Sequence, residues 1–204
     1  MKNKKLVIDI EESIETKRSL LLIEDKIHNA IQIIYKKLSQ GGKVLLCGNG
    51  GSASDAQHFS GELLGRFEME RPPLAAVALT TDTSTLTAVG NDYDYSQIFS
   101  KQVSGLGRAN DILFAISTSG NSANVIEAIR VAQEKNMRVI ALTGKDGGKI
   151  RQLLNAQDIE ICAPAKRTCR VQEIHILVIH ALCDMIDSAL FETTSATTQT
   201  TVIE

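Results

Sequence analysis

Apolar residues recur at three- and four-residue spacing through the first forty residues, and this pattern ends at Gly41. Leu20, Ile27 and Ile31 belong to the pattern, and Lys and Glu residues lie between them. This periodicity is typical of an amphipathic helix. We therefore expect residues 1–40 to form a helical segment that packs on the rest of the chain.

After Gly41 the chain alternates between short β-rich runs and longer amphipathic stretches. The runs are candidate strands, at residues 43–47, 74–79, 111–116, 138–143 and 158–162. The amphipathic stretches are candidate helices, at residues 52–67, 96–106, 122–136, 149–154 and 171–190. Such alternation predicts an α/β fold with a largely parallel sheet covered by helices on both faces. We expect one domain over residues 41–191 and a disordered, Thr-rich tail over residues 192–204.

Composition and charge exclude several classes of protein. The 204 residues carry 22 basic and 24 acidic side chains, which gives a net charge of −2, and 4% of the residues are aromatic. Nucleic-acid-binding and membrane-surface proteins usually have a basic excess, and base stacking needs aromatic rings. The longest apolar run, at residues 74–79, is far shorter than the ~20 residues that span a bilayer. We therefore expect a cytoplasmic protein whose partners are neither nucleic acid nor membrane.

The N-terminus and the cysteines agree with this location. Acidic residues at Asp9, Glu11 and Glu12 occupy the stretch in which a signal peptide would be apolar. None of the four cysteines forms a CxxC pair, so a zinc knuckle or a thioredoxin-like motif is excluded. In a reducing compartment we expect four free thiols.

A glycine-rich loop, residues 48–53 (GNGGSA), follows the first candidate strand and leads into a helix. Glycines let the backbone approach a ligand closely, and the free N–H groups of a helix start attract an anion. The pattern is a variant of the dinucleotide-binding motif, which also needs an acidic residue at the end of the next strand. Glu68 and Glu70 precede that strand, and Asp82 lies too far along the chain. A nicotinamide cofactor is therefore not favoured.

A second loop, residues 117–122 (STSGNS), lies between the third candidate strand and the helix that follows. It carries four hydroxyl groups, those of Ser117, Thr118, Ser119 and Ser122. Hydroxyls at a helix start, together with the helix dipole, form a neutral site for a phosphate. An ordinary helix N-cap accounts for Ser122 but not for four hydroxyls together. Because the loop has no Lys or Arg, it suits a small phosphomonoester better than a triphosphate.

A third loop, residues 144–149 (GKDGGK), resembles a P-loop but departs from it at both ends. Thr143 stands where that motif has its first Gly, and Ile150 replaces its Ser or Thr. We expect this loop to be a turn that enters a helix.

Two helices carry candidate acid–base or metal-binding residues. His58 and Glu62 are four residues apart and project from one helix face, where they can share a metal, flank a substrate or form a surface pair. On the last candidate helix His180 lies in an apolar run and needs a polar partner, as a hydrogen-bonded core histidine also does. Helix geometry aligns Glu173 with His180 better than Gln172, but sequence spacing leaves both open.

The motifs taken together resemble a known family. Residues 47–67 (CGNGGSASDAQHFSGELLGRF), 116–129 (ISTSGNSANVIEAI) and 171–187 (VQEIHILVIHALCDMID), with VGNDY and LTGKDGG between them, are similar to the phosphoheptose isomerases of the SIS superfamily. The resemblance implies a flavodoxin-like three-layer sandwich with a parallel five-stranded sheet, plus an N-terminal helix. It implies a homotetramer with active sites at subunit interfaces. It also implies conversion of sedoheptulose 7-phosphate to D-glycero-D-manno-heptose 7-phosphate through an enediol, an early step toward the heptose of the lipopolysaccharide core.

The resemblance also implies roles for individual residues. The zinc ligands, for one Zn²⁺ per subunit, would be His58, Glu62, Gln172 and His180. The substrate would contact Glu62 and Gln172. Its sugar part would also contact Asn49, Gly50, Gly51, Asn91 and Asp92. Its phosphate would bind the four hydroxyls of Ser117, Thr118, Ser119 and Ser122. Asp55 would support the zinc site or position a water. Glu62 and His180 would transfer the protons between C1 and C2, and whether they act mainly as bases or as ligands stays open.

Two related kinds of protein without this activity are the alternatives. One relative in the superfamily is a tetrameric, non-enzymatic adaptor that binds the replication initiator protein and lacks the Glu and the second His of the isomerase site. This chain has both Glu62 and His180, which favours the enzyme. Sensors of phosphosugars with this domain usually carry a DNA-binding domain as well, and residues 1–40 contain no basic recognition helix.

Overall fold

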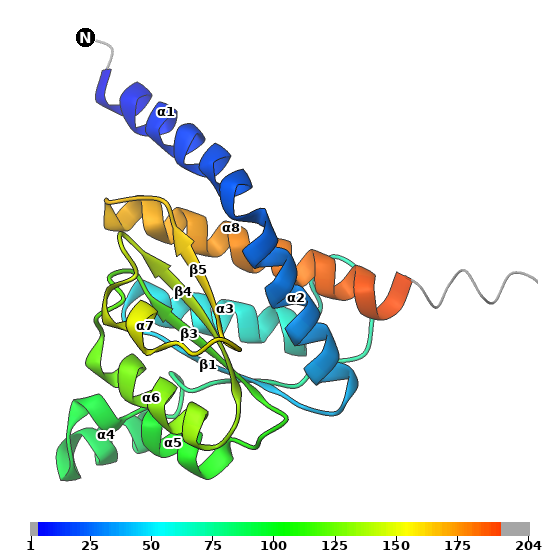
Figure 1. The fold of residues 1–204 in the computed structure, drawn as a ribbon, viewed down its shortest axis with the longest axis vertical. Coiled ribbons are helices and arrows are strands. Elements are labelled where there is room, and N and C mark those ends of the chain that lie inside the picture. The colour runs from blue at the N-terminus through cyan, green and yellow to red at the C-terminus, as the bar shows by residue number, and fades with distance from the viewer. Residues whose placement is uncertain (1–3, 193–204) are drawn as a thin grey trace, which may run out of the picture.

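Five strands form one parallel sheet in the computed structural model, which describes residues 4–192 (Figure 1). The strands are β1 (Val44–Cys47), β2 (Ala76–Ala78), β3 (Ile112–Ser117), β4 (Arg138–Gly144) and β5 (Ile159–Ala163). Their order across the sheet is β2–β1–β3–β4–β5, which is the flavodoxin-like order. The expected five-stranded parallel sheet is confirmed, and each strand begins and ends within two residues of its predicted run.

Helices connect the strands and precede them. The α-helices among the described residues are α1 (Lys4–Arg18), α2 (Glu24–Ser39), α3 (Gly51–Leu64), α4 (Thr83–Asp92), α5 (Ser100–Leu106), α6 (Ala123–Glu134), α7 (Gly148–Leu153) and α8 (Thr168–Asp187). Short turns of 3₁₀ or π helix are η1 (Ser19–Ile23), η2 (Tyr95–Gln97) and η3 (Ser188–Glu192). Residues 193–204, which make up most of the predicted disordered tail, lie outside the described residues.

The sheet separates two hydrophobic cores, because side chains along a strand alternate between its faces. On one face Val44 and Leu46 join apolar residues of α2, α3 and α8. On the other face Leu45 and Cys47 join those of α5, α6 and α7. Helices thus cover both faces, as the predicted three-layer sandwich requires (Figure 1). Burial on both sides explains why the central strands β1 and β3 are continuous apolar runs, whereas the edge strands β2 and β5 alternate in burial.

The sequence pattern does not predict α4. Its ten residues (TSTLTAVGND) are rich in Thr and include Ser and Gly, which are weak helix formers. The Asp82 side chain caps its start by accepting a hydrogen bond from Thr85 N. The helix is therefore signalled by its N-cap and not by its apolar periodicity.

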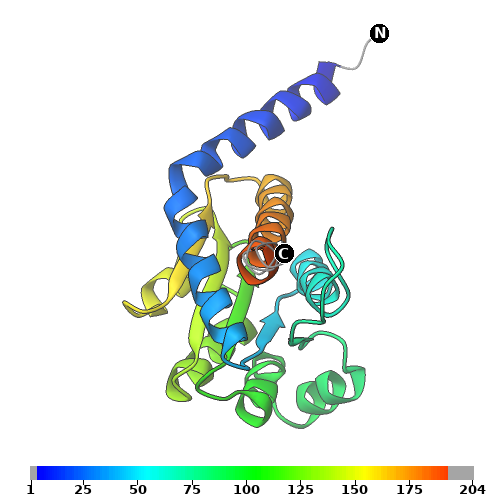
Figure 2. The same cartoon turned by 90° about the vertical axis from the view of Figure 1, so that its right-hand side faces the viewer.

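The N-terminal segment consists of two helices that pack differently. Helix α2 buries Ala30, Ile31 and Ile34 in the core it shares with α8 and the sheet. Helix α1 has no buried residues and extends away from the body of the molecule (Figure 2). It is linked to the start of α8 by ion pairs, among them Arg167 Nη1 to Asp9 Oδ1 at 3.0 Å. Of the two helices, α2 therefore packs on the domain, as expected for residues 1–40, whereas α1 is linked to it by these ion pairs.

Helix α8 is the longest helix of residues 4–192. Together with the turn that follows it, the segment Thr168–Phe191 is long and apolar enough to cross a membrane by length and composition alone. In this fold it packs on α2, α3, β4 and β5, and its apolar residues belong to one of the two cores. That is the position of a core helix, which passes the same test of length and composition.

Candidate functional site

Helices α3 and α8 lie side by side (Figure 1). Helix α3 follows β1 and α8 follows β5, so both begin at the carboxyl edge of the sheet, where open α/β folds bind ligands. Gly51 of α3 lies against Gln172 of α8, and two turns further along α3 His58 faces His180. A Cβ on Gly51 would collide with the Gln172 amide, so a side chain at this position would displace Gln172 from its place beside α3.

The histidine–glutamate cluster, formed by His58, Glu62 and His180, lies between these two helices. His58 Nε2 is 2.9 Å from His180 Nε2 and 3.3 Å from Glu62 Oε1. A hydrogen bond between two imidazole nitrogens needs one of them to donate and the other to accept. The Phe67 ring lies beside His180, with the ring centroids 5.7 Å apart. The structure thus brings an acid–base carboxyl group and two imidazoles to one place.

Asp55 is half-buried on α3, one turn before His58. Its Oδ2 atom is buried and has no hydrogen-bond partner among the described residues. Burial raises the pKa of Asp55 to about 6, although the charge of His58 acts in the opposite direction. A carboxyl oxygen in this state can accept a hydrogen bond from a ligand or a water that enters the site.

Adjacent residues at the start of α8 have different neighbours. Gln172 lies against the start of α3, as described above. Glu173 Oε2 accepts a hydrogen bond from Ser13 Oγ of α1 at 2.6 Å, and Glu173 Oε1 pairs with Arg170. The hydrogen bond from Ser13 and the contact with Arg170 lower the pKa of Glu173. Helix geometry alone aligns Glu173 with His180, but the Glu173 carboxylate instead contacts Ser13 of α1 and Arg170.

The serine loop, residues 117–122, connects β3 to α6. Ser117 Oγ and Ser122 Oγ are 2.9 Å apart, and Ser119 Oγ accepts a hydrogen bond from Asn121 N. Ser122 occupies the N-cap position of α6, but its side chain does not cap the helix. An ordinary N-cap therefore does not explain Ser122. The positive end of the α6 dipole and a group of hydroxyls lie together, as an anion site requires.

The loop after β4 supports the serine loop. Gly120 has a φ of +65°, and a Cβ on it would collide with Gly147 O. Thr118 O lies against Gly144, which also touches Val171 at the start of α8. Helix α7 begins in this loop, so the P-loop-like segment is the helix-entry turn expected from the sequence. It packs the serine loop close to α8.

An amide pair joins the glycine loop to α6. Asn49 Nδ2 donates to Asn124 Oδ1, and Asn124 Nδ2 donates to Asn49 Oδ1, both at 2.8 Å. Asn124 is buried and its Oδ1 also accepts from Val125 N. Between this pair and α3, Gly50 has a φ of +55° and precedes the first helical residue. The motif spacing does not single out Asn124, whose only signal is a polar side chain on the buried face of an amphipathic helix.

Asn91 and Asp92 lie at the end of α4, whose apolar residues pack on the core of the α5–α7 face. Both side chains are exposed, and Asn91 Nδ2 donates to Asp92 Oδ1 at 2.8 Å. Within residues 4–192 no hydrogen bond connects them to the histidine–glutamate cluster. Their proposed contact with substrate therefore rests on the family resemblance.

The other histidine of α8, His175, is buried away from the cluster. Its Nε2 is 2.9 Å from Thr143 O of β4, and its Nδ1 has no hydrogen-bond partner among the described residues. Burial lowers the pKa of His175 to about 4, so the ring is neutral near neutral pH. This histidine serves the packing of α8 on the sheet.

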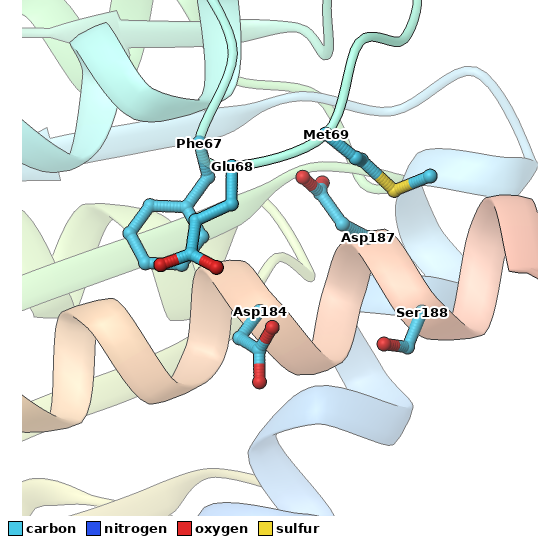
Figure 3. Close-up of a pocket in the computed structure, with 6 residues that line it drawn as sticks. All are labelled: Phe67, Glu68, Met69, Asp184, Asp187 and Ser188. Atoms are coloured by element: carbon cyan, nitrogen blue, oxygen red, sulfur yellow. The ribbon is translucent and has the colours of Figure 1, made fainter.

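A pocket of about 250 Å³ lies beyond Phe67, the ring that borders His180 (Figure 3). Its walls come from the segment after α3 and from the end of α8: Phe67, Glu68, Met69, Asp184, Asp187 and Ser188. Three carboxyl groups make it acidic, which disfavours a phosphate. The neutral serine loop is the better place for an anion.

The residue types of the cluster fit a zinc ion, because imidazole nitrogens and carboxylate oxygens are common zinc ligands. Both imidazole Nε2 atoms and Glu62 Oε1 are within hydrogen-bonding distance of at least one other member. In the part of the chain that the structure describes, however, no group of three or more His, Cys, Asp or Glu side chains has the arrangement of a metal site. The donors suit zinc by their chemistry, and the described side chains do not form a ready-made cage.

Comparison with known proteins supports the fold and identifies the family. The SIS domain family matches residues 11–144 of this chain. The phosphoheptose isomerase of Aromatoleum aromaticum is 63% identical over 164 residues, which are 80% of this chain and 83% of that protein. Among solved structures, a phosphoheptose isomerase from Neisseria gonorrhoeae has a TM-score of 0.87 and 52% identity, covering 92% of this chain and 100% of that one. One from Francisella tularensis has a TM-score of 0.89 and 46% identity, covering 92% and 99%.

Proposed function

The chain belongs to the phosphoheptose isomerases of the SIS domain family and is a sugar-phosphate isomerase, and we propose that it converts sedoheptulose 7-phosphate to D-glycero-D-manno-heptose 7-phosphate. We propose further that this reaction takes place in the cytoplasm and supplies the heptose of the lipopolysaccharide core. The observation that carries the proposal is the contact of His58 with both Glu62 and His180. An aldose–ketose isomerase needs an acid and a base at one place, and this cluster supplies them.

The proposed chemistry moves one proton from C1 to C2 and a second proton from O1 to O2, through an enediol. We assign these transfers to Glu62 and His180, which come from facing helices and reach a substrate between them from two sides. A Zn²⁺ held by His58, Glu62, Gln172 and His180 would polarise the oxygens on C1 and C2. A carboxylate bound tightly to a metal is a weaker base, so the two roles of Glu62 compete.

The serine loop is the proposed phosphate site. The hydroxyls of Ser117, Thr118, Ser119 and Ser122 lie at the start of α6, and two of them are 2.9 Å apart. Asn49 belongs to the glycine loop that leads into α3 and is bonded to α6 through Asn124, so it is suited to bind sugar hydroxyls between the phosphate and the cluster. Gly50 and Gly51 complete this wall, and Asn91 and Asp92 are added by the family resemblance.

The oligomer we propose is a homotetramer with active sites at its interfaces. Apolar residues of α1 support an association of copies, because Leu6, Val7, Ile8 and Ile10 are each at least half exposed. Leu6, Val7 and Ile10 lie within about 100° of one another around the helix, and an exposed apolar face of this kind is typical of a protein interface. Light scattering of the purified chain should give the mass of four copies.

The adaptor interpretation has no support from the relatives described above, which are named as isomerases. The two residues that distinguish the enzyme from the adaptor, Glu62 and His180, both touch His58. A metabolic role is therefore favoured over a binding role.

A coupled assay on sedoheptulose 7-phosphate with zinc-loaded protein tests the proposed function. Glu62→Gln and His180→Ala should each lower kcat at least ~100-fold if these side chains transfer protons. Absence of turnover in the unaltered protein, or normal turnover in both variants, would contradict the proposal.

A third variant, Ser119→Ala, tests the phosphate assignment separately. It should mainly raise KM, because the phosphate is remote from the reacting carbons. A variant that binds substrate normally and loses only turnover would show that the phosphate lies elsewhere.

A further inference from the structure

Arg71 lies buried between the two helices that carry the histidine–glutamate cluster. Its Nε donates to Asp187 Oδ1 of α8 at 2.8 Å, and its Nη2 donates to Glu62 O of α3 at 2.7 Å. The side chains of Arg71 and Asp187 are only 1% and 5% exposed. Two charges removed from water to this extent are costly unless hydrogen bonds satisfy them well.

The remaining donors of Arg71 go to carbonyl groups at and just after the end of α3 and to the carbonyl of the neighbouring Pro72. Nη1 donates to Leu63 O at 2.8 Å and, at longer distance, to Gly65 O and Pro72 O. Carbonyls at the C-terminal end of a helix have no partner inside the helix. A positive charge there also interacts favourably with the negative end of the helix dipole. The planar guanidinium serves all these acceptors at once, which the single ammonium of a lysine does not.

Asp187 depends on Arg71. Figure 3 shows the Asp187 carboxylate on the side of α8 that faces the Phe67–Met69 segment. Its Oδ1 bonds Arg71, while its Oδ2 is buried with no hydrogen-bond partner among the described residues. Arg71 is therefore the group that balances this buried charge, and the pair is expected to resist separation.

The ion pair and the Gly51–Gln172 contact lie on opposite sides of the cluster along the two helices. Asp187 follows His180 by seven residues, which is two helix turns, so both lie on the same side of α8. Glu62, whose carbonyl Arg71 holds, is itself a member of the cluster. The helix pair is fixed before and after the point at which His58 meets His180.

We propose that Arg71 and Asp187 are positioning residues, which set how α3 lies against α8 and thereby how Glu62 faces His180. They touch neither the reacting carbons nor the proposed phosphate site. The effect on turnover rests on the proposed function, whereas the effect on the geometry of the cluster does not. A shift of the order of 1 Å in such a constellation is enough to cost up to ~100-fold in rate.

Arg71→Lys is the first test, because it keeps the positive charge beside Asp187 and removes the guanidinium fork. We expect kcat to fall by about 10-fold or more while KM stays within about twofold, because the serine loop is untouched. Asp187→Asn, which keeps an acceptor for Arg71 Nε, should have the same kind of effect. If both variants fold and keep the kcat of the unaltered protein, the proposal is wrong.

The matched control is the ion pair between Lys43 and Asp111, at the opposite edge of the sheet. Lys43 Nζ is 2.5 Å from Asp111 Oδ2, and the Asp111 side chain is 3% exposed. Lys43→Gln should lower the melting temperature and leave kcat unchanged. If it lowers kcat as much as Arg71→Lys does, at a similar loss of stability, the effect is one of general destabilisation and the positioning role is refuted.

A spectroscopic readout makes the test independent of substrate. The chain has four histidines, and His28 lies exposed on α2, where it lines a pocket with Ala181 and Met185 of α8 but contacts no member of the cluster among the described hydrogen bonds. In imidazole ¹H–¹⁵N spectra, Arg71→Lys should shift the signals of His58 and His180 more than that of His28. Unchanged signals of His58 and His180 would refute the proposal. Absence of turnover of sedoheptulose 7-phosphate by the unaltered protein would instead refute the proposed function and leave this measurement valid.

Discussion

The side of α8 that faces α3 and the side that faces α1 are built from different interactions. Toward α3, apolar residues of both helices belong to one hydrophobic core, and His58 contacts His180. Toward α1, charged residues form a network in which Arg167 and Arg170 both contact Asp9 and Glu12. Arg167 is half exposed, and α1 itself has no buried residues.

The side of α8 that faces α3 carries the candidate site, whereas the side that faces α1 holds α1 on the molecule. A Cβ on Gly51 would displace the Gln172 amide, whereas a network of several ion pairs tolerates the loss of one half-exposed member such as Arg167. Gln172 and Glu173 are adjacent in the sequence and belong to the two different sides. The contacts of Gln172 and Glu173 therefore follow from the helix that each one faces and not from its distance from His180 along the sequence.

The largest effect should come from replacing Gln172, with replacement of its neighbour Glu173 as the comparison. Gln172→Ala should lower kcat at least ~100-fold and reduce the zinc content of the purified protein, because it removes a proposed ligand. Glu173→Ala should leave both within about twofold, since its partners are Ser13 and Arg170. The measurements are kcat and the zinc content of both purified variants. Equal losses of kcat and zinc in Gln172→Ala and Glu173→Ala would contradict the distinction between the two sides of α8.

A second prediction concerns the side of α8 that faces β4. His175 is neutral in the folded chain, with a pKa of about 4, whereas in the unfolded chain it takes up a proton near pH 6.5. Folding stability is therefore full above pH 6.5 and falls as the pH decreases to 4, by about 3 kcal/mol in all. His175→Gln should remove this part of the pH dependence in urea unfolding, and His28→Gln is the exposed control. If the free energy of unfolding depends on pH between 4 and 6.5 in the same way with and without His175→Gln, the assignment of this dependence to His175 is wrong.

The smallest effect is expected on the α1 side. Arg167→Ala removes one member of a network whose other arginine, Arg170, keeps both acidic partners. The melting temperature should fall only slightly, and kcat should stay within about twofold. A large loss of activity in this variant would mean that α1 takes part in the site of the same chain.

The sheet could be predicted from the sequence because its central strands are buried on both faces and appear as continuous apolar runs. The loops at its carboxyl edge could be located for the same reason, and with them Ser119 and the glycine loop. The choice between Gln172 and Glu173 could not be made, because it depends on Ser13, about 160 residues away in the sequence. Arg71 was equally inaccessible, since a lone arginine after a helix gives no sign that it will be buried.

The amide pair of Asn49 and Asn124 has a consequence for the dependence of the site on pH. Neither carboxamide titrates, so the junction between the glycine loop and the serine-loop helix keeps the same hydrogen bonds whatever the acidity of the solution. Asp55, whose pKa burial raises to about 6, lies on α3 beyond that junction. The hydrogen bonds that join the glycine loop to α6 are therefore independent of pH, whereas the charge of the neighbouring Asp55 changes near pH 6.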